Sequence, residues 1–278
     1  MKIVTAIAEL RKVRAALPKP LGLVPTMGYL HEGHLSLVRR ARMECASVVV
    51  SIFVNPTQFS ANEDLGAYPR DLDRDLNLLG AEGVDMVWTP TDDEIYPVGY
   101  QTWVTVEDLS QTLEGLHRPG HFRGVTTIVA KLFNSILPDK AYFGQKDAQQ
   151  AVVIQRMTED LNLPLEVVVC PTVREPDGLA MSSRNTCLDP KQREAATVVY
   201  RSLTAAVRSF EAGERDAEVL RSRMSDVLST EPLARPEYVS VADPYTLKEL
   251  DGRVERALFS MAVYFGETRL IDNIVVGD

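Results

Sequence analysis

Two of the chain's four histidines, His31 and His34, lie three residues apart in the stretch VPTMGYLHEGHLS, residues 24–36. This stretch joins a run typical of a strand to a run typical of a helix. The unpaired backbone N–H groups at a helix N-terminus favour the binding of an anion such as phosphate. Gly33 lacks the Cβ atom that would keep a ligand away from the turn, and either imidazole could donate a hydrogen bond to charge that develops on phosphoryl oxygens. The pattern therefore predicts a phosphate-binding turn that takes part in catalysis.

Three other interpretations of this turn compete with the catalytic one. The glycine spacing is that of a P-loop, but His34 and Leu35 replace the lysine and the hydroxyl residue that bind phosphate and magnesium, which excludes a P-loop. A metal site is the second alternative, because the histidines form two closely spaced pairs. These pairs are His31 with His34 and His117 with His121. The third alternative is an ordinary helix cap with two solvated histidines, so the motif alone does not decide.

Two further stretches follow predicted strands and carry amides and charges. Asn55 and Gln58 come after a strand predicted over residues 47–54, and their amides suit hydroxyl and carboxylate groups, although Asn-Pro also starts ordinary turns. In YFGQKDAQQ, residues 142–150, a lysine could neutralise phosphate and an aspartate could fix a ribose hydroxyl or a neighbouring residue. Two glutamines there could contact substrate. These four residues are Lys146, Asp147, Gln149 and Gln150.

Two loops are rich in cations and hydroxyl groups. LEGLHRPGHFRGV, residues 113–125, contains Arg118, Arg123 and two histidines, and it could either close over an anionic substrate or be a solvated connection. In LAMSSRN, residues 179–185, two serines and an arginine could form a mobile anion clamp, because the guanidinium fork suits phosphate oxygens. An ordinary serine-rich linker is the alternative. The clamp would consist of Ser182, Ser183 and Arg184.

The elements that must position these residues alternate regularly through the first 175 residues. Apolar runs rich in β-branched residues predict strands over 21–26, 47–54, 84–90, 140–144 and 165–173. Segments of helical period predict helices over 34–46, 70–83, 125–137 and 148–163. Such alternation predicts an α/β fold, a Rossmann-like open parallel sheet with helices on both faces. Ligands of such sheets bind beyond the carboxyl ends of the strands, which is the edge these polar stretches share.

The pattern changes after residue 175. Asp189 and Pro190 are typical of a helix start, and the helix is predicted to run to about Gly213. A second helix is predicted near 216–229, and strands over 237–243 and 257–266. We therefore predict two domains, a Rossmann-like one over residues 1–175 and a smaller C-terminal α+β one over residues 176–278.

Composition excludes several classes of protein. The net charge of −9 argues against a nucleic-acid partner. No apolar run reaches the roughly 18–20 residues of a membrane span, and the first residues differ from a secretory signal because charges interrupt them. The three cysteines are far apart and form no C-x-x-C, which argues against disulfides and structural zinc and predicts a reducing cytoplasm.

Six motifs together resemble the pantothenate synthetase (pantoate–β-alanine ligase) family over nearly the whole chain. They are PTMGYLHEGHLSLV, IFVNPTQF, NEDLGAYPRD, RPGHFRGV, FGQKDAQQ and REPDGLAMSSRN, in the family's order and spacing. This family belongs to the H-x-G-H nucleotidyl transferases, relatives of class I aminoacyl-tRNA synthetases, and the MSSR stretch stands where those relatives carry a K-M-S-K-S loop. One departure is Gln145, because the family usually reads FGEKD.

The resemblance implies an AMP-forming carboxylate–amine ligase that works in two steps. The carboxylate of pantoate attacks the α-phosphorus of ATP–Mg²⁺, giving pantoyl adenylate and pyrophosphate, and the amine of β-alanine then gives pantothenate and AMP. Mg²⁺ would accompany ATP, with no other metal. The first domain would bind ATP and pantoate, the second would act as a lid, and the enzyme would be a cytoplasmic homodimer with the first domain at the interface.

The resemblance also implies roles for particular residues. His34 is the implied proton donor, with His31 beside it, and the other implied catalytic residues are Lys146, Ser182, Ser183 and Arg184. Gln58, Gln150 and Asn55 are implied at pantoate, and Tyr68 lines the pocket. The implied ATP-binding residues are Met27, Gly28, Tyr29, Leu30, His31, Glu32, Gly33, His34, Gly144, Gln145, Lys146, Asp147, Val173, Met181, Ser182, Ser183 and Arg184. No particular role follows for His117, Arg118 and His121.

Three other functions remain open at this point. One is an adenylyltransferase that accepts a phosphorylated substrate, against which the neutral Gln58 and Gln150 argue. The second is a metal-dependent hydrolase that uses the four histidines. The third is a nucleotide-binding regulator with a decayed site, against which the joint presence of H-x-G-H, Lys-Asp and Ser-Ser-Arg argues.

Overall fold

The computed structural model describes residues 1–59, 65–66 and 68–277 and contains two compact units. The first comprises Met1–Gln111, Gly115–Gly144 and Gln150–Pro171. The second comprises Thr112–Glu114, Gln145–Gln149 and Thr172–Asp278. The second unit therefore consists of the C-terminal part of the chain together with two short segments from earlier in the sequence.

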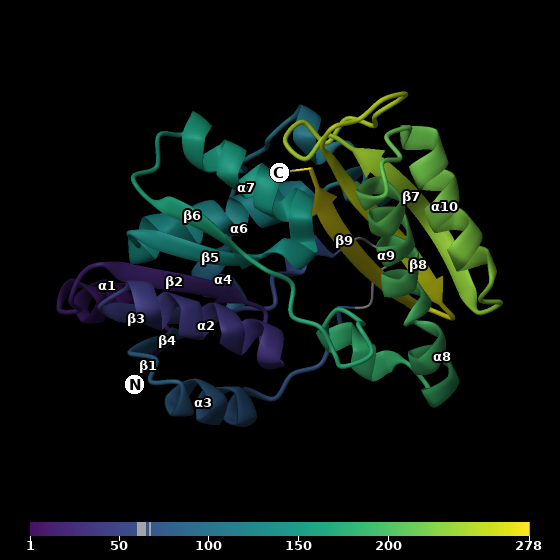
Figure 1. Cartoon of the computed structure of the whole chain (residues 1–278). Coiled ribbons are helices and arrows are strands. Elements are labelled where there is room, and N and C mark those ends of the chain that lie inside the picture. Colours follow the sequence, from purple (N-terminus) through teal and green to yellow (C-terminus); the bar gives the residue numbers. More distant parts are fainter. Residues whose placement is uncertain (60–64, 67, 278) are drawn as a thin grey trace. The chain divides into compact units, whose positions relative to one another are not determined.

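The first unit is built on a six-stranded sheet with the order β1-β4-β3-β2-β5-β6, in which neighbouring strands pair in parallel (Figure 1). The strands are β1 (Lys2–Val4), β2 (Leu21–Thr26), β3 (Ser47–Ile52), β4 (Met86–Trp88), β5 (Lys140–Gly144) and β6 (Glu166–Cys170). The chain builds β3 and β4 on one side of β2 and then crosses to β5 on the other side. Ligands of open α/β sheets bind beyond the carboxyl ends of the strands at such a switch point.

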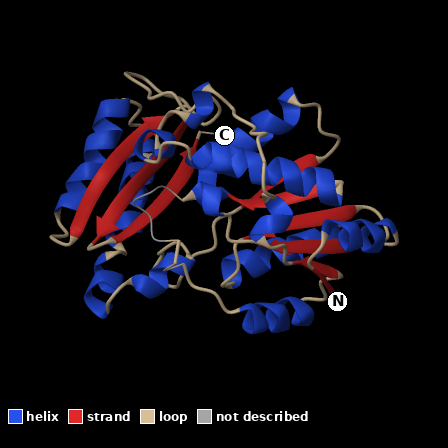
Figure 2. Cartoon of the chain, turned by 180° about the vertical axis from the view of Figure 1, so that it is seen from behind, coloured by secondary structure: helices blue, strands red, loops and turns tan. Residues whose placement is uncertain are grey.

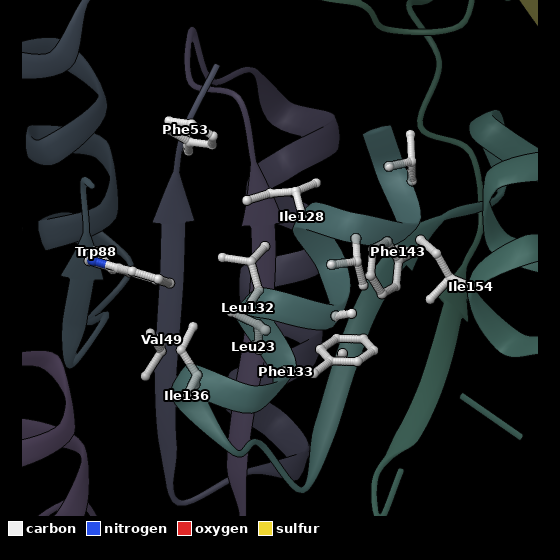
Figure 3. Packing of buried hydrophobic residues seen from close by; sticks show 14 of the residues in the cluster. Leu23, Val49, Phe53, Trp88, Ile128, Leu132, Phe133, Ile136, Phe143 and Ile154 are labelled. Carbon is white, nitrogen blue, oxygen red and sulfur yellow. The ribbon is translucent and has the colours of Figure 1, made fainter. Parts of the chain in front are cut away.

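Helices cover both faces of this sheet, which confirms the predicted fold class. On one face, Leu23, Val49 and Phe143 pack against α6 (His121–Ile136) and α7 (Ala148–Asp160) (Figure 3). On the other face, Val24 and Val50 pack against α2 (Glu32–Glu44) and α3 (Leu72–Ala81). Neighbouring residues of one strand point to opposite faces, so both faces of the strands must be apolar, as their β-branched runs predicted. The helices are α1 (Ile7–Ala15), α2 (Glu32–Glu44), α3 (Leu72–Ala81), α4 (Asp92–Ile95), α5 (Glu114–His117), α6 (His121–Ile136) and α7 (Ala148–Asp160).

The second unit packs helices on a three-stranded antiparallel sheet (Figure 2). Its strands are β7 (Ala234–Ala242), β8 (Ala257–Phe265) and β9 (Thr268–Val276). Its helices are α8 (Pro190–Ala195), α9 (Val198–Glu211) and α10 (Ala217–Ser229). Phe210 of α9, Leu220 and Met224 of α10 and Phe259 of β8 share one buried cluster, which makes this unit's core separate from those of the six-stranded sheet.

The structure corrects several predicted boundaries. The single helix predicted from Pro190 to about Gly213 is two helices, although its break at Ala196 and Thr197 keeps right-handed backbone angles. The helix predicted over 125–137 begins at His121. Strands β1 and β9 were not predicted at all. No helix within the described residues is long and apolar enough to cross a membrane.

Candidate active site

The turn after β2 has an unusual backbone. Gly28 has φ +81° and Tyr29 has φ +52°, and this left-handed conformation costs an ordinary residue such as Tyr29 roughly 1–2 kcal/mol. A Cβ at position 28 would lie 3.0 Å from Cγ2 of Ile52 and 3.1 Å from Oδ2 of Asp75. The left-handed conformation therefore favours glycine at position 28, and a Cβ there would also be in tight contact with its neighbours.

Both histidines of the turn cap helix α2. His31 is the N-cap residue, and its Nδ1 accepts a hydrogen bond from the backbone N–H of Gly33 at 3.2 Å. Nδ1 of His34 accepts one from the backbone N–H of His31 at 3.3 Å, so the two rings form a reciprocal capping box. Their centroids are 4.1 Å apart. Because Nδ1 accepts in each ring, the proton of each neutral imidazole lies on Nε2.

The cap and the catalytic interpretation of these histidines are therefore compatible. Capping fixes the orientation of each ring and assigns the donor proton to Nε2. Among the residues that the structure describes, no three His, Cys, Asp or Glu side chains are grouped so that they could hold a metal ion. The exposed Glu32 forms an ion pair with Arg39 seven residues later, so its carboxylate has a partner within α2.

Asp75 of α3 holds this turn, a contact that the sequence analysis missed. Its Oδ2 accepts from the N–H of Tyr29 at 2.7 Å and its Oδ1 from the N–H of Leu30 at 2.8 Å. The side chain is 1% exposed, and burial raises the pKa of Asp75 against the pull of these two bonds. Arg74 donates to the carbonyl of Leu30 at 2.9 Å. A costly buried carboxylate thus stabilises the left-handed backbone that precedes the histidine cap.

We expect Asp75→Asn to weaken both the fold and the turn. An amide offers one oxygen where the backbone presents two N–H donors, so one buried N–H loses its partner at a cost of about 1–3 kcal/mol. The free energy of unfolding should fall by about that amount in urea denaturation, and the rate of the ATP-dependent reaction should fall at temperatures where the protein is folded. Asp73→Asn is the matched control, because Asp73 lies on the same helix and is exposed. Equal stability of the two variants would contradict the holding role.

Asn55 orients Gln58 after strand β3. The side chain of Asn55 is fully buried, and its Oδ1 accepts from the hydroxyl of Tyr96 at 2.8 Å and from that of Thr57 at 3.0 Å. Its Nδ2 therefore donates, at 2.9 Å to Oε1 of Gln58 and at 3.1 Å to the carbonyl of Gly124. The bond from Asn55 fixes the side-chain amide of Gln58. Its Oε1 points towards Asn55, and its Nε2 is therefore the donor on the other side of the amide.

Other predicted residues of the first unit lie at the end of β5 or in the segments that follow β3 and β5. Gly144 closes β5, and a Cβ there would have no neighbour within 4 Å. Gln150 lies in the first half of α7 and is half-buried. The ring of Tyr68 meets Phe59 edge-on at 6.0 Å between centroids. Of the motif NEDLGAYPRD, residues 62–64 and 67 lie outside the described residues.

In the second unit, strand β9 forms hydrogen bonds with the segment Gln145–Gln149, which contains Lys146. Nδ2 of Asn273 donates to the carbonyls of Gln145 and Lys146 at 2.9 and 2.8 Å. Its Oδ1 must therefore face Gln145, whose Nε2 donates to it at 3.0 Å. A carboxylate cannot make this last bond, so the departure at position 145 replaces an anion with a donor that fits Asn273. Lys146 lies 3.5 Å from the carboxylate of Asp147.

Gln149 links the segment Gln145–Gln149 to the segment Thr112–Glu114, which belongs to the same unit. Its Nε2 donates to the carbonyl of Thr112 at 2.8 Å, and its Oε1 accepts from the N–H of Glu114 at 2.9 Å. The side chain is buried. Gln149 and Gln150 were both suggested to contact substrate, but the side-chain amide of Gln149 bonds to the protein backbone.

The serine–arginine stretch begins a 3₁₀ helix, η4 (Ser183–Cys187). Ser182 is its N-cap residue and accepts from the N–H of Arg184 at 3.3 Å. The N–H of Met181 donates to the carbonyl of Val173 at 3.0 Å, so these two predicted ATP-binding residues are neighbours. Near the base of this loop, Arg174 pairs with the buried Asp272 of β9 at 2.6 Å. The segments that carry the predicted residues of the second unit are therefore both anchored to β9.

The fold and the side chains at the ends of its strands indicate a broad class of protein. A parallel α/β sheet with helix-capping imidazoles, amides and glycine turns after its strands is typical of an enzyme that binds a small polar ligand there. Comparisons with known proteins narrow this class to one family.

A family model described as pantoate-beta-alanine ligase matches residues 2–275. A pantothenate synthetase of Chloroflexus aggregans is 62% identical over 274 residues, covering 98% of this chain and 99% of the relative. The crystal structure of pantothenate synthetase from Thermus thermophilus has a TM-score of 0.94 and 48% identity, covering 99% of both chains. A pantoate-beta-alanine ligase from Francisella tularensis, complexed with beta-gamma ATP and beta-alanine, has a TM-score of 0.81 and 35% identity, covering 99% of this chain and 97% of that one.

The chain belongs to the pantoate-beta-alanine ligase family. This confirms the resemblance seen in the sequence, together with the predicted ligase class and the ATP-dependent condensation of pantoate with β-alanine.

Proposed function

We propose that the chain makes pantothenate in two steps through pantoyl adenylate. Pantoate's carboxylate attacks the α-phosphorus of ATP and displaces pyrophosphate, and the amine of β-alanine then attacks the acyl carbon and displaces AMP. A carboxylate has no adequate leaving group until adenylation supplies one. The observation that carries the proposal is the match to the pantoate-beta-alanine ligase family over residues 2–275.

In the first unit, the histidine turn acts on the ATP phosphates. His34 donates the Nε2 proton to the phosphoryl oxygens as charge develops there, with His31 beside it. The N-terminus of α2 adds its dipole. Met27 to Gly33 and Gly144 border the nucleotide. The capping bonds at Nδ1 support this role, because they put the proton on the nitrogen that must donate it.

Pantoate is held by Gln58 and Gln150. Both are neutral, which suits hydroxyls and a carboxylate and disfavours a substrate that carries an extra phosphate. The buried Asn55 acts indirectly, because both its amide atoms are bonded within the protein and one of them turns Gln58. Tyr68 lines the pantoate pocket.

The second unit contributes cations and hydroxyls to ATP. Lys146 neutralises phosphate, Ser182, Ser183 and Arg184 bind the phosphates, and Gln145, Asp147, Val173 and Met181 border the nucleotide. Mg²⁺ arrives with ATP, since this ion keeps several waters and is held mainly by substrate phosphates. Residues 1–175 form the ATP- and pantoate-binding domain, and residues 176–278 form the lid domain.

The enzyme acts as a homodimer in the cytoplasm. The family resemblance supports the dimer, with the first domain at its interface. All three cysteines are free thiols, and the exposed Cys187 fits a reducing compartment.

The decisive experiment supplies ATP–Mg²⁺, pantoate and β-alanine and omits each acid in turn. Pyrophosphate release should require pantoate but not β-alanine, and AMP and pantothenate should appear only when both acids are present. Release of pyrophosphate with β-alanine alone, or an absolute need for both acids before any pyrophosphate forms, would contradict the proposed adenylate pathway.

A further inference from the structure

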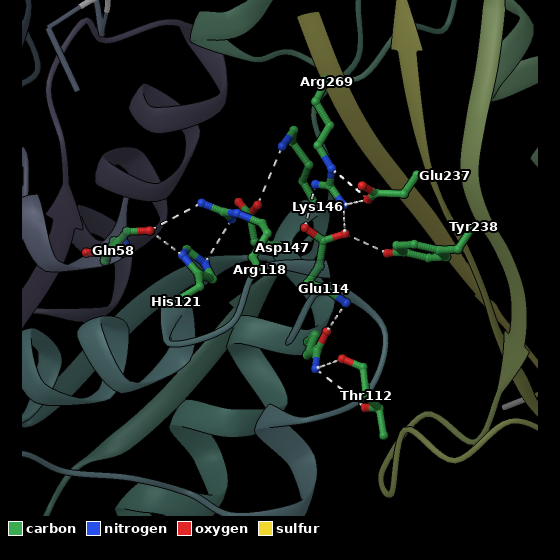
Figure 4. Close-up of polar contacts among 11 residues, drawn as sticks. Gln58, Thr112, Glu114, Arg118, His121, Lys146, Asp147, Glu237, Tyr238 and Arg269 are labelled. Atoms are coloured by element: carbon green, nitrogen blue, oxygen red, sulfur yellow. Dashed lines mark hydrogen bonds and ion pairs between the residues drawn. The ribbon is translucent and has the colours of Figure 1, made fainter. Parts of the chain in front are cut away.

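Two side chains of the motif RPGHFRGV, those of Arg118 and His121, bond to the backbone carbonyl of Gln58. Nδ1 of His121 lies 2.8 Å from the carbonyl oxygen of Gln58, and Nη2 of Arg118 donates to the same oxygen at 3.4 Å (Figure 4). Nη1 of Arg118 lies 3.1 Å from Nε2 of His121. The three residues thus form a closed triangle of polar contacts within the first unit.

These contacts fix the state of the His121 ring. A carbonyl oxygen only accepts, so Nδ1 carries the proton, and a guanidinium only donates, so Nε2 accepts. The ring is therefore the neutral Nδ1–H tautomer, with both nitrogens engaged by the protein. A ring in this state presents no donor to a phosphate and no lone pair to a metal.

A glycine of the same motif lets helix α6 touch the Gln58 turn directly. A Cβ at Gly124 would lie 2.3 Å from the carbonyl oxygen of Thr57 and 2.9 Å from the N–H nitrogen of Gln58. The carbonyl of Gly124 also accepts from the side chain of Asn55 at 3.1 Å. The first turn of α6 therefore packs closely against the 3₁₀ turn η1 (Pro56–Gln58) and bonds to the carbonyl of Gln58 and to the side chain of the N-cap residue Asn55.

We infer that His121 and Arg118 are positioning residues for the pantoate subsite, acting through Gln58 without touching substrate. Asn55 sets the direction of the Gln58 amide, and His121 with Arg118 sets the backbone from which that amide projects. The inference rests on the proposed role of Gln58 in holding pantoate. It gives the motif RPGHFRGV a function in binding the acid rather than in phosphate chemistry.

The test compares substrate dependences of pyrophosphate release in the full-length protein. His121→Ala should raise the KM for pantoate about three- to tenfold, as expected for one lost hydrogen bond, and leave the KM for ATP within twofold. His121→Asn should recover most of the loss, because its Nδ2 can reach the position of Nδ1 and donate to Gln58. His117→Ala is the matched control, since this residue lies immediately before the motif and its side chain is exposed.

A double-mutant cycle separates positioning from direct contact. In a Gln58→Ala background, His121→Ala should raise the KM for pantoate no further, because the side chain that it positions is gone. Additive effects, no rescue by His121→Asn, or equal changes in both KM values would overturn the inference. Failure of the proposed function has a different signature: wild type that forms no pantoate-dependent pyrophosphate, or Gln58→Ala with an unchanged KM for pantoate, and the inference falls with it.

Discussion

The variant His34→Gln is expected to release pyrophosphate about 10²–10³ times more slowly than wild type, the range found when one donor to a developing oxyanion is removed. Glutamine is chosen because it is the usual partner at this position of a capping box. Its side-chain oxygen can accept from the N–H of His31 as Nδ1 of His34 does at 3.3 Å. The substitution therefore removes the imidazole and keeps the helix start.

His34→Ala provides the comparison that separates chemistry from capping. It should lose activity to the same extent and should also lose about 1 kcal/mol of stability, as removal of a cap does. Stopped-flow or coupled measurement of pantoate-dependent pyrophosphate release, with thermal unfolding of each variant, distinguishes the two effects. Activity of His34→Gln within tenfold of wild type would refute the proton-donor role, and the histidines would then be a helix cap only.

Local sequence signals were sufficient for the class of fold and for the place of the histidine turn. The run SVVVSI in β3 is buried along nearly its whole length, so its apolar character on both faces predicted a central parallel strand. The turn before α2 was also found, because a strand pattern stops and a helical one begins around two glycines. Such signals depend on residues that are close in sequence.

What local patterns could not reveal were contacts between distant segments. Asp75 reaches the backbone of Leu30 across 45 positions, and its neighbour Asp73 looks the same in sequence but is exposed. Strand β9 was missed because buried polar residues, Asp272 and Asn273, interrupt its apolar pattern. Those two residues are polar because they hold Arg174 and Gln145, so the feature that hid the strand is the one that anchors the predicted site.

A third side chain of β9, Arg269, ties the segment Thr112–Glu114 into the second unit. It donates to both oxygens of Glu114 at 2.7 and 2.9 Å and to Glu237 at 2.9 Å (Figure 4). Burial lowers the pKa of Arg269, but the two carboxylates more than offset this and raise it. Burial and the charge of Glu114 raise the pKa of Tyr238, whose hydroxyl donates to Glu114 at 2.8 Å. Arg269 and Glu114 are only 11% and 8% exposed.

Arg269→Met should therefore lower the free energy of unfolding by about 3–5 kcal/mol, the cost of removing one partner from a buried ion pair. Two carboxylates would remain close together without their cation. Urea denaturation followed by circular dichroism measures the loss. Arg253→Met is the matched control, because that arginine pairs on the surface and should change stability by less than about 0.5 kcal/mol.

The double variant Arg269→Met with Glu114→Gln tests the cause of this loss. If uncompensated negative charge is responsible, removing one carboxylate should restore part of the stability, so the double variant should be more stable than Arg269→Met alone. A further fall would mean that Arg269 stabilises the unit by packing instead. Partial recovery would establish that an ion pair between distant parts of the sequence holds the segment Thr112–Glu114. That segment also bonds to Gln149, three residues after Lys146.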